Sequence, residues 1–87
     1  MINQARLADG TILERTAMQE QNGILWIYCY NNISMEEVSE LLSDPEKTET
    51  ITDVQPEKEV AYSGYTVLQQ INRDPCYTIV AEMHKPE

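Results

Sequence analysis

A single short helix lies between two groups of strand-like segments, and this arrangement most constrains the fold. The helix is expected over residues 34–43. Ser34 is a favoured N-cap, and Glu37 completes a capping box in which each side chain satisfies the other residue's free backbone N–H. Asp44-Pro45 ends the helix, because the residue before a proline is pushed out of helical geometry. A helix of about ten residues is unstable alone in water and must pack on a sheet.

The apolar side chains of this helix indicate how it packs. Met35, Val38, Leu41 and Leu42 fall on one face, and polar side chains occupy the rest of the surface. We therefore expect the helix to cover one face of a sheet.

Two turn signals divide the segment before the helix into three strands. Asp9-Gly10 separates residues 2–7 from 11–17 and is typical of a tight type I′ hairpin. Asn22-Gly23 is a second such signal. It leads into the continuous apolar and aromatic run 24–30, which predicts a strand covered on both faces, either central in the sheet or lying between the helix and a partner.

The segment after the helix predicts three further strands. Residues 50–54 carry a weak strand signal, and residues 77–84 form the closing strand. The longest pattern, 59–72, changes phase at Ser63-Gly64, which predicts a β-bulge or a bend that curves the sheet. Asn72–Pro75 predicts the turn before the last strand.

These elements define the expected fold class. The order β-β-β-α-β-β-β indicates one α+β domain over residues 1–87, with a mainly antiparallel, curved sheet and the helix at 34–43 on one face. Closure into a split or partial barrel is an alternative, because a bulged, strongly curved sheet can approach its own edge.

The charge excludes several functions. With 15 acidic and 6 basic residues, the formal charge is −9, which argues against binding nucleic acid or anionic lipid.

The start of the chain has no signal-peptide pattern, and the run 24–30 is too short for a membrane helix, so a cytoplasmic or virion protein is expected. Nine carboxylates lie within residues 34–59, either as a solvated surface or as a site for a basic partner. They are Glu36, Glu37, Glu40, Asp44, Glu46, Glu49, Asp53, Glu57 and Glu59.

The sequence contains no catalytic, cofactor-binding or metal-binding pattern. His84 is the single histidine and has no partners at metal-ligand spacing. Cys29 and Cys76 form no CxxC motif and are expected to be reduced, with a disulfide between them as the alternative. The spacing of Glu36 and Glu40 makes a bound cation conceivable, but solvent exposure explains it without a ligand. A non-enzymatic protein without cofactor, metal or small-molecule ligand is predicted.

The aromatic residues are the remaining functional candidates. Trp26, Tyr28 and Tyr30 share one strand face, whereas Tyr62, Tyr65 and Tyr77 lie on the last strands. Because the chain has no phenylalanine, these side chains form either its core or a surface for a protein partner. The candidate interface residues are Trp26, Tyr28, Tyr30, Tyr62 and Tyr65.

Four segments resemble one family. They are ADGT at residues 8–11, LLSDPEKTETIT at 41–52, YSGYTVLQQINRD at 62–74 and YTIVAEMHK at 77–85. In these the chain resembles small prophage proteins of Gram-positive, Clostridia-type gut bacteria, which are encoded among genes for virion morphogenesis, particularly the tail. The resemblance spans most of the chain, implies a structural or assembly role and transfers no catalytic residue.

Two functions follow as hypotheses. The first is a structural or assembly protein, plausibly phage-derived, that acts through sheet edges and aromatic surface in a homo-oligomer or tail assembly. The alternative is an acidic inhibitor or decoy that uses the carboxylates of residues 34–59 to bind a basic surface of an enzyme or nucleic-acid-binding protein.

Overall fold

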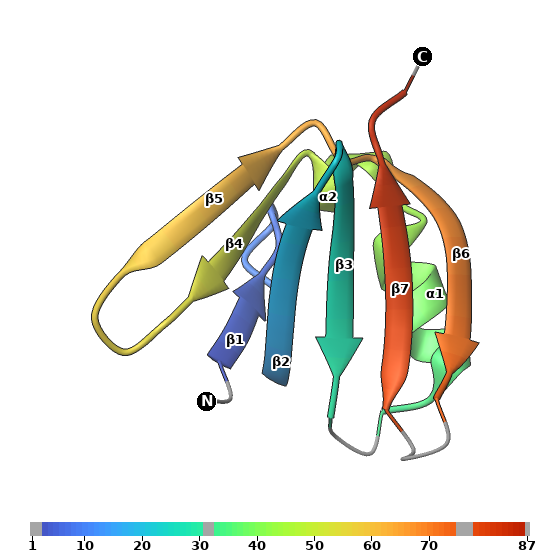
Figure 1. Cartoon of the computed structure of the whole chain (residues 1–87), viewed down its shortest axis with the longest axis horizontal. Helices are drawn as coiled ribbons and strands as arrows, with labels where there is room; N and C mark the ends of the chain where they lie inside the picture. The colour runs from blue at the N-terminus through green and yellow to red at the C-terminus, as the bar shows by residue number, and fades with distance from the viewer. Residues whose placement is uncertain (1–2, 31–32, 75–77, 87) are drawn as a thin grey trace.

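The computed structural model describes residues 3–30, 33–74 and 78–86, and an antiparallel sheet dominates it. Seven strands lie in the order β5-β4-β1-β2-β3-β7-β6, and every neighbouring pair is antiparallel (Figure 1). The strands are β1 (Asn3–Arg6), β2 (Ile12–Gln21), β3 (Ile24–Cys29), β4 (Thr50–Val54), β5 (Glu59–Ser63), β6 (Val67–Arg73) and β7 (Ile79–His84). The α+β class and the mainly antiparallel sheet are therefore confirmed.

The predicted helix is confirmed as α1 (Met35–Leu42). The Ser34 hydroxyl accepts a hydrogen bond from the backbone N–H of Glu37 at 3.1 Å, as expected of an N-cap. Val38 and Leu42 are fully buried, and Met35 and Leu41 pack against the same core. The helix lies behind the sheet in Figure 1 and contacts β6.

A second, very short helix, α2 (Pro45–Thr48), follows α1 and was not predicted. Pro45 stands at its first position, where a fixed φ and a missing N–H are tolerated. The Asp44 side chain caps α2 by accepting from the N–H of Glu46 at 3.0 Å. The Asp44-Pro45 pair therefore ends one helix and begins another.

Of the two expected hairpin turns, one has the predicted geometry. Asn22 and Gly23 have φ of 55° and 77°, and Gln21 pairs with Ile24, so β2 and β3 are joined by a two-residue turn with both φ angles positive. Between β1 and β2, only Gly10 has a positive φ, and a longer loop forms in which Asp9 accepts from the N–H of Thr11 at 3.0 Å. The tight type I′ turn predicted at Asp9-Gly10 is therefore wrong.

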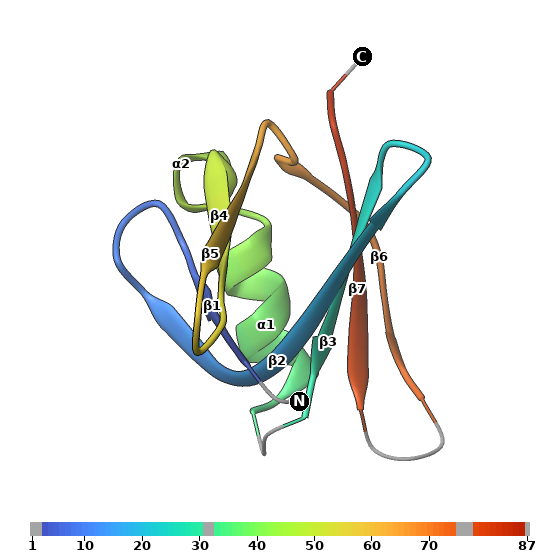
Figure 2. The same cartoon turned by 60° about the vertical axis from the view of Figure 1, so that its left-hand side comes forward.

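The long strand predicted over residues 59–72 is two strands. Gly64, with φ 87°, donates its N–H to the carbonyl of Glu49 at 3.0 Å, and the chain there leaves β5 at one sheet edge and crosses to β6 at the other. The change of phase at Ser63-Gly64 marks a bend, which is one of the two predicted alternatives, and not a bulge within one strand. Within the described part of the chain, β5 and β6 do not pair, so the sheet is open and does not close into a barrel (Figure 2).

The bulge that bends the sheet lies in β2. Asn3 pairs with Thr16 and Gln4 with Glu14, so Arg15 is an extra residue, and its φ of 59° is left-handed. Leu13 and Thr16 are consequently both buried on the same side of the sheet. Figure 2 shows β2 curving through this region, which turns β1, β4 and β5 towards α1.

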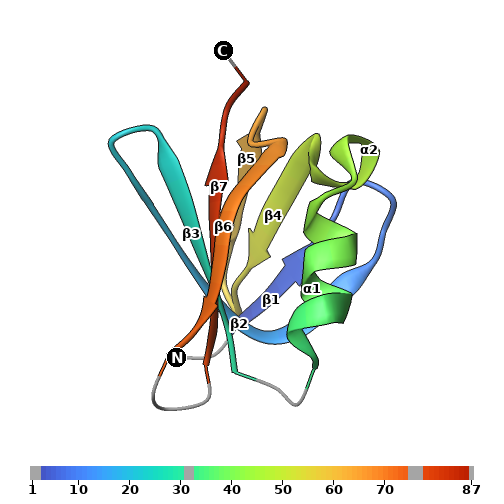
Figure 3. The same cartoon turned by 90° about the vertical axis from the view of Figure 1, so that its right-hand side faces the viewer.

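The core lies between the sheet and α1, so we call the sheet face towards α1 the inner face and the opposite one the outer face (Figure 3). Alternate residues of β3 and β7 point inward and are buried. They are Leu25, Ile27, Cys29, Ile79, Ala81 and Met83. Several predictions fall outside the described residues. They concern Ile2 in the first strand, Tyr77 in the last strand, the turn at Pro75 and the state of Cys76.

Candidate interaction surface

Apolar and aromatic side chains occupy the outer face of β3 and its neighbours. Ile24, Trp26 and Tyr28 alternate with the buried residues of β3 and are half-buried. Tyr28 pairs with Val80 of β7 and with Ala17 of β2, so these side chains form one continuous row across three strands. We call Ile24, Trp26, Tyr28 and Val80 the outer patch; its four members are absent from the core cluster on the other side of the sheet.

The surroundings of the outer patch are largely uncharged. By register, Gln19 and Gln21 of β2 and Gln70 and Asn72 of β6 lie on the same face. Val67, at the start of β6, adds an apolar side chain that is 36% exposed. A largely uncharged, partly apolar face that no described helix covers is typical of a surface that binds protein.

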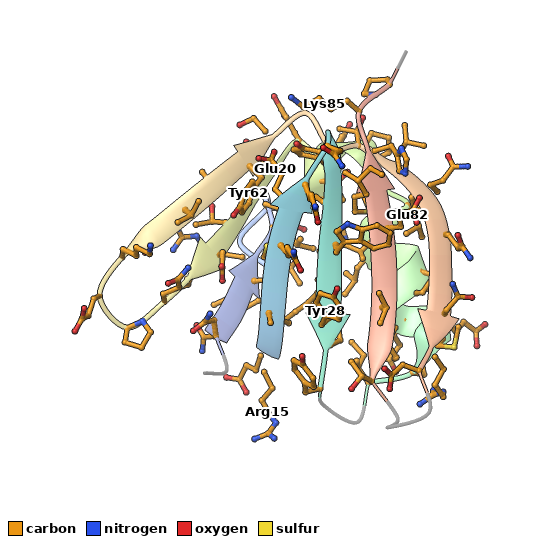
Figure 4. The ribbon with its side chains drawn as sticks, viewed as in Figure 1. Arg15, Glu20, Tyr28, Tyr62, Glu82 and Lys85 are labelled. Atoms are coloured by element: carbon orange, nitrogen blue, oxygen red, sulfur yellow. The ribbon has the colours of Figure 1, made fainter. Side chains whose placement is uncertain are left out.

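One ionisable pair lies within this face. Glu82 stands opposite Trp26, and His84 stands opposite Ile24. His84 Nε2 lies 2.6 Å from Glu82 Oε2, and the Glu82 side chain is only 18% exposed. Figure 4 shows Tyr28 and Glu82 on the same side of the sheet. The sequence pattern left His84 without a partner. Side chains alternate along β7, so residues 80, 82 and 84 lie on one face. This alternation could have predicted that His84 meets Glu82.

The remaining candidate tyrosines lie elsewhere. Tyr30 follows β3 and is 43% exposed. Tyr65, in the connection between β5 and β6, is 2% exposed and belongs to the core. Tyr62 of β5 packs edge-on against Tyr65, with ring centroids 6.5 Å apart. The structure therefore brings Trp26 and Tyr28 together on the outer face and separates them from Tyr62 and Tyr65.

Tyr65 is held by charged groups at the end of the sheet where β2 meets β3. Its hydroxyl donates to the Glu20 carboxylate, and the Lys85 ammonium lies 5.1 Å from the centre of its ring. The hydrogen bond to Glu20, together with burial, raises the pKa of Tyr65 to about 12. Burial and the nearby carboxylates of Asp53 and Glu20 also raise the pKa of Tyr62. The Tyr65 ring is therefore fixed in the core, whereas Glu20 and Lys85 remain exposed.

The carboxylates of residues 34–59 are dispersed. Glu36, Glu37 and Glu40 are exposed on α1, whereas Asp53 of β4 is buried and accepts from Gln55 at 3.0 Å. Glu59 of β5 pairs with Arg6 at 2.7 Å. Figure 1 places the β4–β5 turn far from α1. These residues form several separate surfaces, an arrangement that does not favour the acidic-decoy hypothesis.

Cys29 and the metal-ligating residue types are the other side chains to consider for a site. Within ranges 3–30, 33–74 and 78–86, no three His, Cys, Asp or Glu side chains gather in a way that could hold a metal ion. Cys29 is fully buried, and burial raises the pKa of its thiol to about 11, which leaves almost no thiolate at neutral pH. Two open hollows, of about 330 and 240 Å³, flank the β4–β5 turn and share Gln55 and Pro56. Neither is lined by a residue of the outer patch.

The fold and the outer patch together define a small α+β domain with one helix-covered sheet face and one neutral, aromatic sheet face. None of its described helices is long and apolar enough to cross a membrane. No family model, curated protein or solved structure matches the chain.

Proposed function

We propose that this chain is a non-enzymatic structural or assembly protein that acts through protein–protein contacts at its outer patch. The supporting observation is the position of Trp26 and Tyr28, which are half-buried on the sheet face opposite α1. Tryptophan and tyrosine dominate binding energy in protein interfaces, because each buries a large area and keeps one polar group for hydrogen bonding.

The setting is part of the same proposal. The resemblance to prophage proteins suggests a phage tail or its assembly, and hence the cytoplasm of a bacterial host or a virion. The acidic chain is poorly suited to nucleic acid, since its formal charge is −9. Its partner is therefore a protein surface, either another copy of the chain or a different subunit.

Site-specific photo-crosslinking in the cells that produce the protein tests the proposal. A benzophenone amino acid replaces Tyr28 in one variant and Ile12 in the other. Ile12 is a suitable control because it is 50% exposed and lies on the outer face of β2, beyond the bulge at Arg15. We expect a discrete protein adduct from position 28 and none from position 12. Equal yields at the two positions, or no adduct at either, would contradict the proposal.

A further inference from the structure

Charge distribution identifies the most suitable occupant of the outer patch. Four strands form this part of the outer face: β3, β6, β7 and the part of β2 that follows the bulge. At their described outer-face positions, the ionisable side chains are Tyr28, Glu82 and His84. The exposed glutamates of α1 lie on the other side of the sheet. A basic partner would be attracted to those glutamates, whereas two copies of a chain with a charge of −9 repel each other least where their surfaces are neutral.

The chemistry of this face is also self-complementary. In a two-fold dimer, residue i of one copy contacts residue j of the other, and the reverse contact occurs as well. Glu82 and His84 project from the same face of β7 two residues apart, with Trp26 and Ile24 directly beside them. A two-fold axis between Glu82 and His84 would place each carboxylate against the other copy's imidazole and each Trp26 against apolar surface.

We propose that the occupant of the outer patch is a second copy of this chain, an inference that rests on the proposed function. A two-fold axis relates the two copies and pairs Glu82 of each copy with His84 of the other.

The extent of the face indicates the strength of this association. Four strands of about six residues, spaced roughly 4.8 Å apart, give a face of roughly 15–20 Å on each side. Two such faces cover roughly 450–800 Å² in total, which is below the usual range of stable specific interfaces. A weak dimer with a dissociation constant of roughly hundreds of micromolar is therefore expected.

Sedimentation of the purified chain, at concentrations from micromolar to millimolar, tests this inference. We expect a dimer whose population rises with concentration. Glu82→Gln should weaken the dimer by at least about threefold, because the contact with His84 of the other copy loses its carboxylate. Trp26→Ser should weaken the dimer at least about tenfold, and Ile12→Ser should leave it unchanged.

A second variant tests the same face independently, in case Trp26→Ser does not fold. Val67→Asp places a charge at an exposed outer-face position of the edge strand β6, and it should also weaken the dimer at least tenfold while the circular dichroism spectrum is retained. A chain that stays monomeric at millimolar concentration overturns the inference, as does a dimer insensitive to Trp26→Ser and Val67→Asp. If the chain is monomeric but position 28 crosslinks a different protein, the second copy is excluded while the proposed function stands.

Discussion

The hydroxyl of Tyr65 donates a hydrogen bond to the carboxylate of Glu20, and this contact joins two segments 45 residues apart in the sequence. Glu20 lies near the end of β2, in the middle of the sheet, whereas Tyr65 belongs to the connection that crosses from the edge strand β5 to the edge strand β6. The contact therefore fixes the crossing segment against the sheet. Tyr62 and Lys85 pack on the Tyr65 ring and strengthen the same attachment.

Removing the Tyr65 hydroxyl tests this attachment. Tyr65→Phe keeps the buried ring and deletes the hydrogen bond to a charged acceptor, so we expect the free energy of unfolding to fall by about 1.5 kcal/mol. Urea denaturation followed by tryptophan fluorescence measures the change. Tyr30→Phe is the matched control, since Tyr30 is 43% exposed and should change stability by less than about 0.5 kcal/mol. Equal effects of the two substitutions would show that the Glu20 contact contributes nothing.

Alkaline pH provides a second test of the same residue. The pKa of Tyr65 in the folded protein is about 12, above the value of about 10 for an unfolded tyrosine, so the folded state holds this proton more tightly. The resulting stability is complete below about pH 10 and is lost as the pH rises through about 12. Denaturation midpoints across this range should fall less steeply in Tyr65→Phe than in the wild type. Some slope should remain, because the pKa of Tyr62 is raised as well.

The bulge at Arg15 gives a prediction about backbone geometry. Arg15 has a φ of 59°, and its carbonyl accepts the N–H of Tyr30 at 2.8 Å. A β-branched side chain is strained in this conformation, whereas glycine adopts it freely. Arg15→Val should therefore be about 1–2 kcal/mol less stable than Arg15→Gly in chemical denaturation. If the two variants are equally stable, the left-handed bulge does not form in solution.

The thiol of Cys29 should be unreactive in the native protein. It is fully buried, and its pKa of about 11 leaves very little thiolate at pH 8. In a Cys76→Ser background, where Cys29 is the remaining cysteine, a thiol reagent should modify the folded chain at least about a hundredfold more slowly than the urea-unfolded chain. Rapid labelling of the native protein would mean that the inner face of β3 is accessible to solvent.

Much of the fold could be predicted because the relevant signals are local. Ser34, Glu37 and the apolar face of residues 35–42 specify α1 through capping and periodicity. Asn22-Gly23 specifies the β2–β3 turn through its φ preferences, and alternation along β3 places Trp26 and Tyr28 on one face. These features depend on residues close together in the chain.

The errors concern interactions between distant segments. The division of residues 59–72 into β5 and β6 depends on Gly64 binding the carbonyl of Glu49 and on two sheet edges formed by strands from both halves of the chain. The left-handed bulge at Arg15 carries no glycine signal, and pairing with β1 and with Tyr30 stabilises it. Neither effect follows from local propensity.

The sequence by itself determined one capped helix, the strands around it and the face on which Trp26 and Tyr28 lie, because capping, turn chemistry and alternation act over a few residues. The tertiary structure alone decided that Tyr65 is a core residue bound to Glu20, that Glu82 and His84 meet beside Trp26, and that the sheet remains open. Those outcomes depend on strand order and register, which arise from long-range packing.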